Sequence, residues 1–372
     1  MKKTEKMKQQ ALIFSLLFLF TLGMGTLSSA QIIRKSKQLT KSFPVNSNTE
    51  IEISNKYGNV NIITWEKDSV RFEIELEVKG SKQSKVDKTF NLIDFDFEST
   101  KYYTNAHTVF VGNSFWSDIS DKSSSFFGSK TTVKIVYNVY LPATTNLKVT
   151  NKYGNIYMSD YNGKLTIDLS NGDFKANDLT GYSIISTEFG ICTIQNIDEA
   201  KMSVRYGSVY LEEGNSLNIV SKSSEFHFTE IGSLQLSSKR DKFFTTTLGI
   251  LKGSSDFTRL EIGTIGKALD FKAKYGDILI SGFGDDVSAF NLNTDDSNVV
   301  LRFTDDKQYD LNIRATEDTK VYYSSSITNI KNREIEGDKK LIQVDCVVGN
   351  SIKKIVSLKI NAESGTLSLK RK

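Results

Sequence analysis

An apolar pattern recurs along this chain at a step of 17 or 18 residues. In LKVTNKYGNIYM, apolar residues stand two positions apart on each side of a central residue, Gly154. The central positions of this copy and the next seven are 154, 172, 190, 207, 224, 241, 258 and 276. Chance alternation would not keep its phase over so many copies, so the pattern indicates a repeat architecture.

Within each copy, the alternation predicts two strands, each with one buried face. The inward–outward phase slips at the centre, where we predict a bend with a positive φ at glycine. A unit of about 18 residues cannot bury its own apolar face, whereas stacked units can. The sequence therefore predicts an all-β fold, a single-stranded parallel β-helix (solenoid) of about 18-residue coils. The general preference for right-handed crossovers predicts its hand.

Two positions beside the centre support this packing. Three residues before the centre, the side chains are mostly small, which predicts a narrow interior near the bend. Directly before the centre, aromatic residues recur, and equivalent positions stack in a solenoid. We expect an aromatic ladder that contains Tyr57, Tyr153, Phe189, Tyr206, Phe257 and Tyr275.

The letters NKYGN occur at residues 55–59 and again at 151–155, which we interpret as one bend used twice. The segment 66–146 between them contains strand-like stretches and, in KQSKVDKTFNLIDFD, a predicted short helix. We expect a β-rich N-terminal cap here, because the end of a solenoid otherwise exposes an unpaired edge. The expected domains are a signal peptide at 1–30, an N-terminal β-rich section with the first coil and an elaborated loop at 31–146, a regular solenoid at 147–304, and C-terminal coils and a cap at 305–372.

The first thirty residues are typical of a secretory signal peptide: a Lys-rich start, the apolar run ALIFSLLFLFTLGM, and small Ser28 and Ala30 before a cleavage point. An uncleaved N-terminal anchor is the alternative. This segment holds four Lys and one Glu, so the remainder has 44 basic and 43 acidic residues and a net charge of +1. That balance predicts no nucleic-acid partner. Because cleavage removes the apolar run, we also expect no membrane span in the remainder of the chain. Periplasm, outer surface and secretion to the medium all stay open.

The chain has two cysteines, Cys192 and Cys346, and two histidines, His107 and His227. These numbers exclude a disulfide framework and a multi-His or Cys-rich metal site, although one bridge is compatible with export. Cys192 stands at an apolar core position of its copy, and Cys346 alternates with apolar residues in LIQVDCVV. We predict two buried, inert thiols, and neither a metal nor a cofactor.

Carboxylates occur in pairs at Asp285–Asp286, Asp295–Asp296 and Asp305–Asp306. Such pairs are typical of solvated turns, with a calcium site, a sugar site or acid–base catalysis as alternatives. His227 stands at an outward position with Glu225 two residues before it. The sequence contains none of the GxSxG, P-loop, HExxH or GxGxxG motifs, so the prediction is a non-enzymatic protein.

Aromatic residues gather among Ser and Asn in the segment 102–127. Such a loop could bind a sugar or a partner protein, or part of it could anchor the loop to the cap. The candidate binding residues are Tyr102, Tyr103, Phe110, Phe115, Trp116, Phe126 and Phe127.

The stretches KSFPV, IEISNKYGNVNI and VYNVYLPATTNLKVTNKYGNIYMSDYNG, with the later NGD, FG and YG bends, resemble the "putative adhesin" family of exported bacterial proteins. The chain is similar to the heads of auto-transporter-adhesin-like proteins of Bacteroidetes, over most of residues 40–370. The resemblance implies an exported adhesin-like protein, and it carries over no catalytic residues. This chain departs from the pattern in its loop at 102–130 and its longer C-terminal segment.

The hypothesis is a non-enzymatic exported binding protein that recognises a glycan or a surface or matrix protein along a rigid face. The alternatives are a carbohydrate-active β-helix enzyme and a structural or envelope-stress protein of the cell envelope. The ligand and the oligomeric state stay open.

Overall fold

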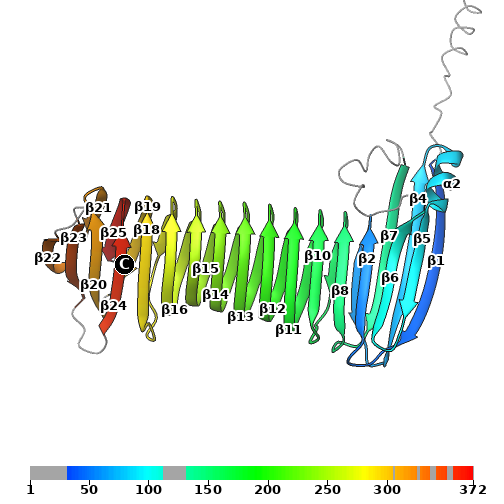
Figure 1. The fold of residues 1–372 in the computed structure, drawn as a ribbon, viewed down its shortest axis with the longest axis horizontal. Coiled ribbons are helices and arrows are strands. Elements are labelled where there is room, and N and C mark those ends of the chain that lie inside the picture. The colour runs from blue at the N-terminus through cyan, green and yellow to red at the C-terminus, as the bar shows by residue number, and fades with distance from the viewer. Residues whose placement is uncertain are drawn as a thin grey trace, which may run out of the picture.

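The computed structural model describes residues 32–111, 131–304, 306–324, 327–335, 341–349 and 355–371. The all-β prediction is confirmed: the strands form one long, open, mostly parallel sheet, laid out as a row along the longest axis of the molecule (Figure 1). One helix, α2 (Gln83–Asn91), lies in the described ranges, where the sequence predicted it. No helix in those ranges has the length and apolarity needed to cross a bilayer.

The central strands begin just after one predicted bend and end just before the next. They are β11 (Phe174–Glu188), β12 (Ile191–Arg205), β13 (Ser208–Lys222), β14 (Glu225–Lys239), β15 (Lys242–Asp256) and β16 (Arg259–Lys274). Neighbours pair in parallel, with Phe174 opposite Cys192 and Val209 opposite Phe226. The step of 17 or 18 residues in the sequence therefore sets the register of the sheet, and equivalent positions of successive copies lie side by side.

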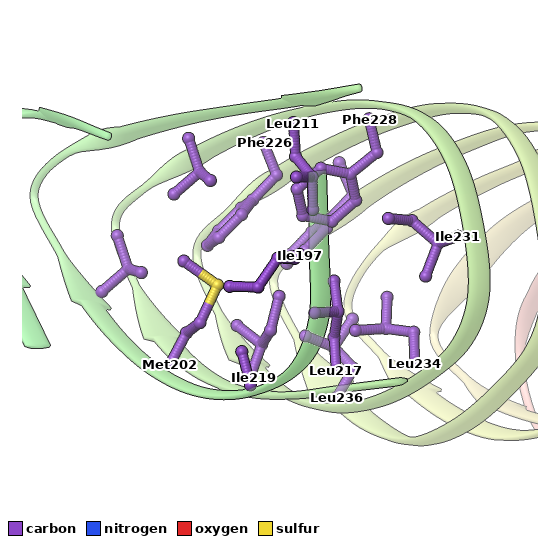
Figure 2. Packing of buried hydrophobic residues seen from close by; sticks show 14 of the residues in the cluster. Ile197, Met202, Leu211, Leu217, Ile219, Phe226, Phe228, Ile231, Leu234 and Leu236 are labelled. Carbon is purple, nitrogen blue, oxygen red and sulfur yellow. The ribbon is translucent and has the colours of Figure 1, made fainter. Parts of the chain in front are cut away.

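The apolar interior lies between two walls of each turn of the chain (Figure 2). Leu211, Phe226 and Phe228, from the first halves of β13 and β14, form one wall, and Ile219 and Leu236, from the second halves, form the other. Residues alternate along a strand, so those between the core residues point outward on opposite sides. We call these surfaces the first-half face (for example Tyr210, His227 and Phe244) and the second-half face (for example Arg205, Lys222 and Lys239).

The bends differ from the prediction in one respect. At the eight centres from 154 to 276, the positive φ falls on the residue before the centre, such as Tyr153 (59°) and Phe189 (56°), so the prediction that glycine adopts it is wrong there. At the C-terminal bend, Gly365 itself has a φ of 89°. Glycine is required for a different reason: a Cβ on Gly190 would lie 1.9 Å from the carbonyl oxygen of Gly172 in the neighbouring repeat. The left-handed conformation costs a non-glycine residue about 1–2 kcal/mol, which the stacking of the aromatic side chains helps to offset.

The two NKYGN copies are neighbours in space although they lie 96 residues apart. Strand β2 (Glu50–Lys56) pairs in parallel with β8 (Asn146–Lys152), which places Asn55 opposite Asn151. The Nδ2 atoms of both asparagines donate across their bends, to the carbonyl oxygens of Gly58 (3.1 Å) and Gly154 (2.8 Å). At the last letter, the Oδ1 atom of Asn59 accepts from the backbone N–H of Asn155 at 3.1 Å. The repeated letters are therefore one set of contacts, made twice in adjacent turns.

Mostly antiparallel strands lie at the N-terminal end. They are β1 (Ile33–Pro44), β4 (Ser69–Gly80), β5 (Ile93–Ser99), β6 (Tyr103–Phe110) and β7 (Thr131–Leu141). Strands β6 and β7 pair in parallel with β2 and β3 (Val60–Thr64), while β4 pairs in antiparallel fashion with both β1 and β7. The parallel stack thus passes into an antiparallel sheet, against which α2 packs.

At the other end, the two C-terminal strands fill a place inside the stack. Strands β24 (Ile355–Ala362) and β25 (Gly365–Arg371) pair on one side with β18 (Ala289–Asp295) and β19 (Ser297–Phe303). On their other side they pair with β20 (Gln308–Thr316) and β21 (Thr319–Tyr323). The remaining strands are β9 (Ile156–Met158), β10 (Leu165–Ser170), β17 (Asp277–Ile280), β22 (Thr328–Ile335) and β23 (Leu341–Val348). The C-terminal strands therefore join two segments that precede them in the sequence.

Asp241 takes the central position where other copies have glycine, and its carboxylate is buried. It accepts hydrogen bonds from the hydroxyls of Ser221 (2.7 Å) and Ser238 (2.6 Å). It also accepts from the backbone N–H groups of Ser224 (2.7 Å) and Lys239 (3.0 Å). Four donors compensate for the loss of water around this charge.

We expect Gly190→Ala to destabilise the protein by roughly 3 kcal/mol, since the new Cβ meets the backbone of the neighbouring repeat. Gly282→Ala is the matched control, because its nearest contact would be an ordinary 3.4 Å. Denaturant unfolding measures both. Equal losses in the two variants would contradict the close-approach explanation.

We expect Asp241→Ala to cost about 3 kcal/mol or more, because four donors lose their acceptor inside the protein. The control is Asp198→Ala, which removes an exposed carboxylate bonded to Asn215 at the surface and should cost less than about 1 kcal/mol. A stability of the Asp241 variant within the error of the control would show that this carboxylate does not hold the bend.

Candidate functional site

A groove runs across the first-half face from β11 to β17. It encloses about 890 Å³. Because the strands are in register, its lining consists of parallel rows of equivalent side chains. One row comprises Lys175, Thr193, Tyr210, His227, Phe244, Glu261 and Leu279, and the adjacent row includes Asn177, Gln195, Glu212, Thr229 and Thr246.

The middle of the first row is a stack of three rings. The ring centroids of Tyr210 and His227 lie 5.0 Å apart with planes at 5°, and those of His227 and Phe244 lie 5.0 Å apart at 17°. Tyr210 is 43% exposed, so the ring edges are presented to solvent while the faces cover one another. The stack follows from the parallel register, which sets successive strands about 4.8 Å apart. The stacked rings form an apolar strip within a groove that is otherwise lined largely by polar side chains.

Glu225 supports this strip. Its Oε1 atom lies 2.7 Å from Nε2 of His227, and its Oε2 atom lies 3.6 Å from Nζ of Lys242. The hydrogen bond with His227 is the main cause that holds the pKa of the Glu225 carboxyl below its ordinary value, and the charge of Lys242 adds to it. The contact orients the imidazole in the stack and places an anionic carboxylate beside the groove.

The bends form a second surface with aromatic character. The predicted ladder is confirmed as three stacked pairs, Tyr57–Tyr153 (centroids 5.6 Å apart), Phe189–Tyr206 (5.1 Å) and Phe257–Tyr275 (4.9 Å). Asn171 separates the first two pairs, and Ser223 and Arg240 separate the last two. The ladder is therefore interrupted in the middle of the molecule.

Lys56 lies against the first of these pairs. Its Nζ atom is 4.9 Å from the ring centroid of Tyr57 and 5.8 Å from that of Tyr153, and the residue is 5% exposed. Burial lowers the pKa of this amine to about 8, and repulsion from Lys152 contributes. The two rings provide cation–π contact in place of a carboxylate.

The candidate loop predicted from the sequence is only partly within the described residues. Tyr102 is 66% exposed, whereas the hydroxyl of Tyr103 donates to Glu52 (3.0 Å). Phe110 packs edge-to-face on Tyr57, with centroids 6.1 Å apart, and lies against the core. The other four residues, Phe115, Trp116, Phe126 and Phe127, lie outside the described residues. The binding loop thus stays a prediction, and two of its three described members are engaged in contacts within the protein.

The other residues singled out in the sequence have structural surroundings. Cys192 and Cys346 are buried, as predicted, and the structure shows both as free thiols. Burial raises their pKa values to about 12 and about 11. Asp285 and Asp295 form ion pairs with Lys307 and Lys274, both at 2.9 Å.

Asp285 and Asp286 lie in a turn, as expected, whereas Asp295 ends strand β18 and Asp296 lies in the bend that follows it. Of the third pair, Asp306 lies in a turn and Asp305 lies outside the described residues. Within the ranges described, no three His, Cys, Asp or Glu side chains gather in a way that could hold a metal ion.

The groove itself was not predicted. The sequence pointed to His227 as an outward residue, but not to its stacking between Tyr210 and Phe244. The available pattern was an aromatic or imidazole ring at the same outward position in three successive copies. Outward positions tolerate many residue types, so the repeat is recognisable in the sequence from its inward positions.

No protein-family model matches this chain, and no curated protein matches it. Three solved structures are similar over most of its length. A "putative cell adhesion protein" from Clostridium sporogenes ATCC 15579 has 10% identity and a TM-score of 0.18, over 91% of this chain and 100% of that chain. A "putative adhesin" from Parabacteroides distasonis ATCC 8503 has 8% identity and a TM-score of 0.25, over 90% and 97%. A "putative lipid binding protein" from the same organism has 13% identity and a TM-score of 0.22, over 89% and 96%.

We expect the stability of the protein, relative to a Lys56→Met variant, to increase as the pH rises from about 8 to 10.5. Below pH 8 the buried amine carries its charge at a cost to the folded state, and the cost declines as the amine deprotonates before its unfolded counterpart. Unfolding by denaturant at about pH 7 and about pH 10 measures this difference. The exposed variant Lys164→Met serves as the control for pH effects common to all variants. A Lys56→Met difference that is the same at both pH values would contradict the assignment.

Proposed function

We propose that this chain is an exported, non-enzymatic, adhesin-like protein that binds a glycan or a protein partner along its first-half face. The observation that carries the proposal is the open groove of about 890 Å³, with the Tyr210–His227–Phe244 stack at its middle. Exposed aromatic side chains within a polar surround are the residues that most often anchor an interface.

The proposal takes the repeat as a right-handed, single-stranded parallel β-solenoid, closed by the antiparallel strands at its N-terminal end. In such an arrangement every outward side chain has a fixed neighbour on the next strand, as Tyr210 has in His227. A partner then meets a surface that is already ordered, so binding does not require loops to become ordered. Affinity would come from several contacts along the groove.

The chemistry of the groove suits an extended partner with both apolar and hydroxyl or amide groups. The ring edges of Tyr210 and Phe244 provide apolar contact, and Gln195, Glu212 and Asn177 offer hydrogen-bond donors and acceptors beside them. Polysaccharides and extended protein segments both have this composition. We propose that the predicted signal peptide directs the protein to the periplasm, the outer surface or the medium.

A carbohydrate-active enzyme is the second candidate, and the Glu225–His227 contact favours it. Glu225 is a carboxylate kept anionic by its neighbours, as a base or nucleophile in glycoside cleavage must be. Such an enzyme would lose turnover completely on Glu225→Gln, whereas a binding protein has no turnover to lose.

Binding to glycan and matrix-protein arrays tests the proposal. We expect the wild-type protein to bind a defined subset, and Tyr210→Ala/Phe244→Ala to weaken that binding about tenfold or more. The matched control is Tyr182→Ala/Tyr322→Ala, which removes two exposed rings outside the groove. Thermal unfolding of each variant confirms that the fold is intact.

No binding on either type of array, or equal binding by the two double variants, would contradict the proposal. Polysaccharide turnover that disappears in Glu225→Gln would replace it with the enzyme. A structural role in the envelope would be indicated if arrays and turnover assays are both negative while deletion of the protein weakens the envelope.

A further inference from the structure

The second-half face carries a groove of its own, on the side of the molecule opposite the groove described above. It encloses about 610 Å³. Its floor is made of short side chains, Ser203, Val220, Ser237 and Ser254, at equivalent positions in four successive strands. Beside this floor, two residues further along each strand, stand Arg205, Lys222 and Lys239.

The three cations form a row with no carboxylate between them. Arg205 lies opposite Lys222, and Lys222 lies opposite Lys239, on strands about 4.8 Å apart. None of them forms an ion pair with a residue in the described part of the chain, and all three are exposed. Like charges that face each other across neighbouring strands destabilise a sheet.

Two other cations on the same face have carboxylate partners. Lys274, in the same row two strands away, pairs with Asp295 on the adjacent strand at 2.9 Å. Lys148 pairs with Glu52 on its neighbour at 3.0 Å. Carboxylates also stand in line with the row, but only at its two ends, as Glu188 and Asp256. The stretch from Arg205 to Lys239 therefore keeps a repulsion that an external anion would relieve.

The aromatic ladder is interrupted at the same strands. Tyr206 stacks on Phe189 through one ring face, and the residue on its other side is Ser223, which is too short to cover the second face. Tyr206 is 43% exposed and lines the groove. An uncovered aromatic face beside a row of cations and hydroxyls is a combination suited to an acidic sugar.

We propose that the second-half face binds an acidic polysaccharide, which lies along the groove. Its carboxylate or sulfate groups would pair with Arg205, Lys222 and Lys239, its hydroxyls would contact Ser203 and Ser237, and one sugar ring would pack on Tyr206. The regular row matches a polymer that carries one acidic group on each repeating sugar. A single-stranded nucleic acid fits less well, because its successive bases require successive aromatic platforms and the ladder is interrupted here.

This inference concerns the face opposite the aromatic groove and does not rest on the proposed function. The two proposed sites are tested with different variants, so a negative result for one proposal does not contradict the other. Binding of the purified protein to polygalacturonate provides the test, with uncharged dextran and oligothymidylate as comparison probes.

We expect the wild-type protein to bind polygalacturonate, with an affinity that declines as salt is added. Arg205→Gln/Lys222→Gln/Lys239→Gln should lose about tenfold or more, and Lys222→Gln alone about threefold. The matched control, Lys164→Gln/Lys267→Gln/Lys320→Gln, removes the same charge from exposed sites outside this groove and should bind like the wild type. The groove variant should unfold at a temperature no lower than that of the wild type, because it removes repulsion.

Three results would overturn the inference: polygalacturonate binding that is absent, or equal in the groove and control variants; equal binding of dextran; and tighter binding of oligothymidylate than of polygalacturonate. The last outcome would reassign the row to nucleic acid.

Discussion

Parallel backbone pairing between successive repeats, in register over most of the chain, is the interaction on which the rest of this structure depends. Each pair of neighbouring strands from β11 to β16 places residues that are 17 or 18 positions apart in the sequence opposite one another. No single repeat could bury its apolar side chains, so core formation and strand pairing stabilise one another. Everything at the surface, including both grooves, inherits its spacing from this register.

The bends show how that register is kept. A residue with a left-handed backbone turns the chain, and the next position must let the neighbouring backbone approach, which glycine does at Gly154, Gly172 and Gly190. Where glycine is replaced, as at Asp241, buried hydroxyl and backbone donors compensate for the side chain that enters the interior. The close approach of neighbouring bends is thus made possible by glycine in some repeats, and by a buried, hydrogen-bonded side chain at Asp241.

Parallel strands in register convert a residue type repeated in the sequence into a row of chemical groups in space. On the first-half face this produces stacked rings at Tyr210, His227 and Phe244, and on the second-half face it produces cations at Arg205 and Lys222. The two faces are separated by the apolar interior (Figure 2), so the row on one face does not contact the row on the other. A long molecule with different rows on opposite sides is suited to partners that are themselves extended.

The sequence by itself determined the strands, the step of 17 or 18 residues between parallel neighbours and the inward residues. Burial requires apolar side chains at this regular step, and the requirement is local to each repeat. The sequence also predicted α2 and the buried thiols of Cys192 and Cys346, which follow from local pattern. Only the tertiary structure decided what depends on contacts between distant segments. It set Asn55 beside Asn151 and placed β25 between β19 and β21, and it assigned the positive φ to Tyr153 rather than to Gly154. Outward positions tolerate many residue types, so the sequence alone does not reveal their rows. The rows form only when the register places equivalent side chains side by side.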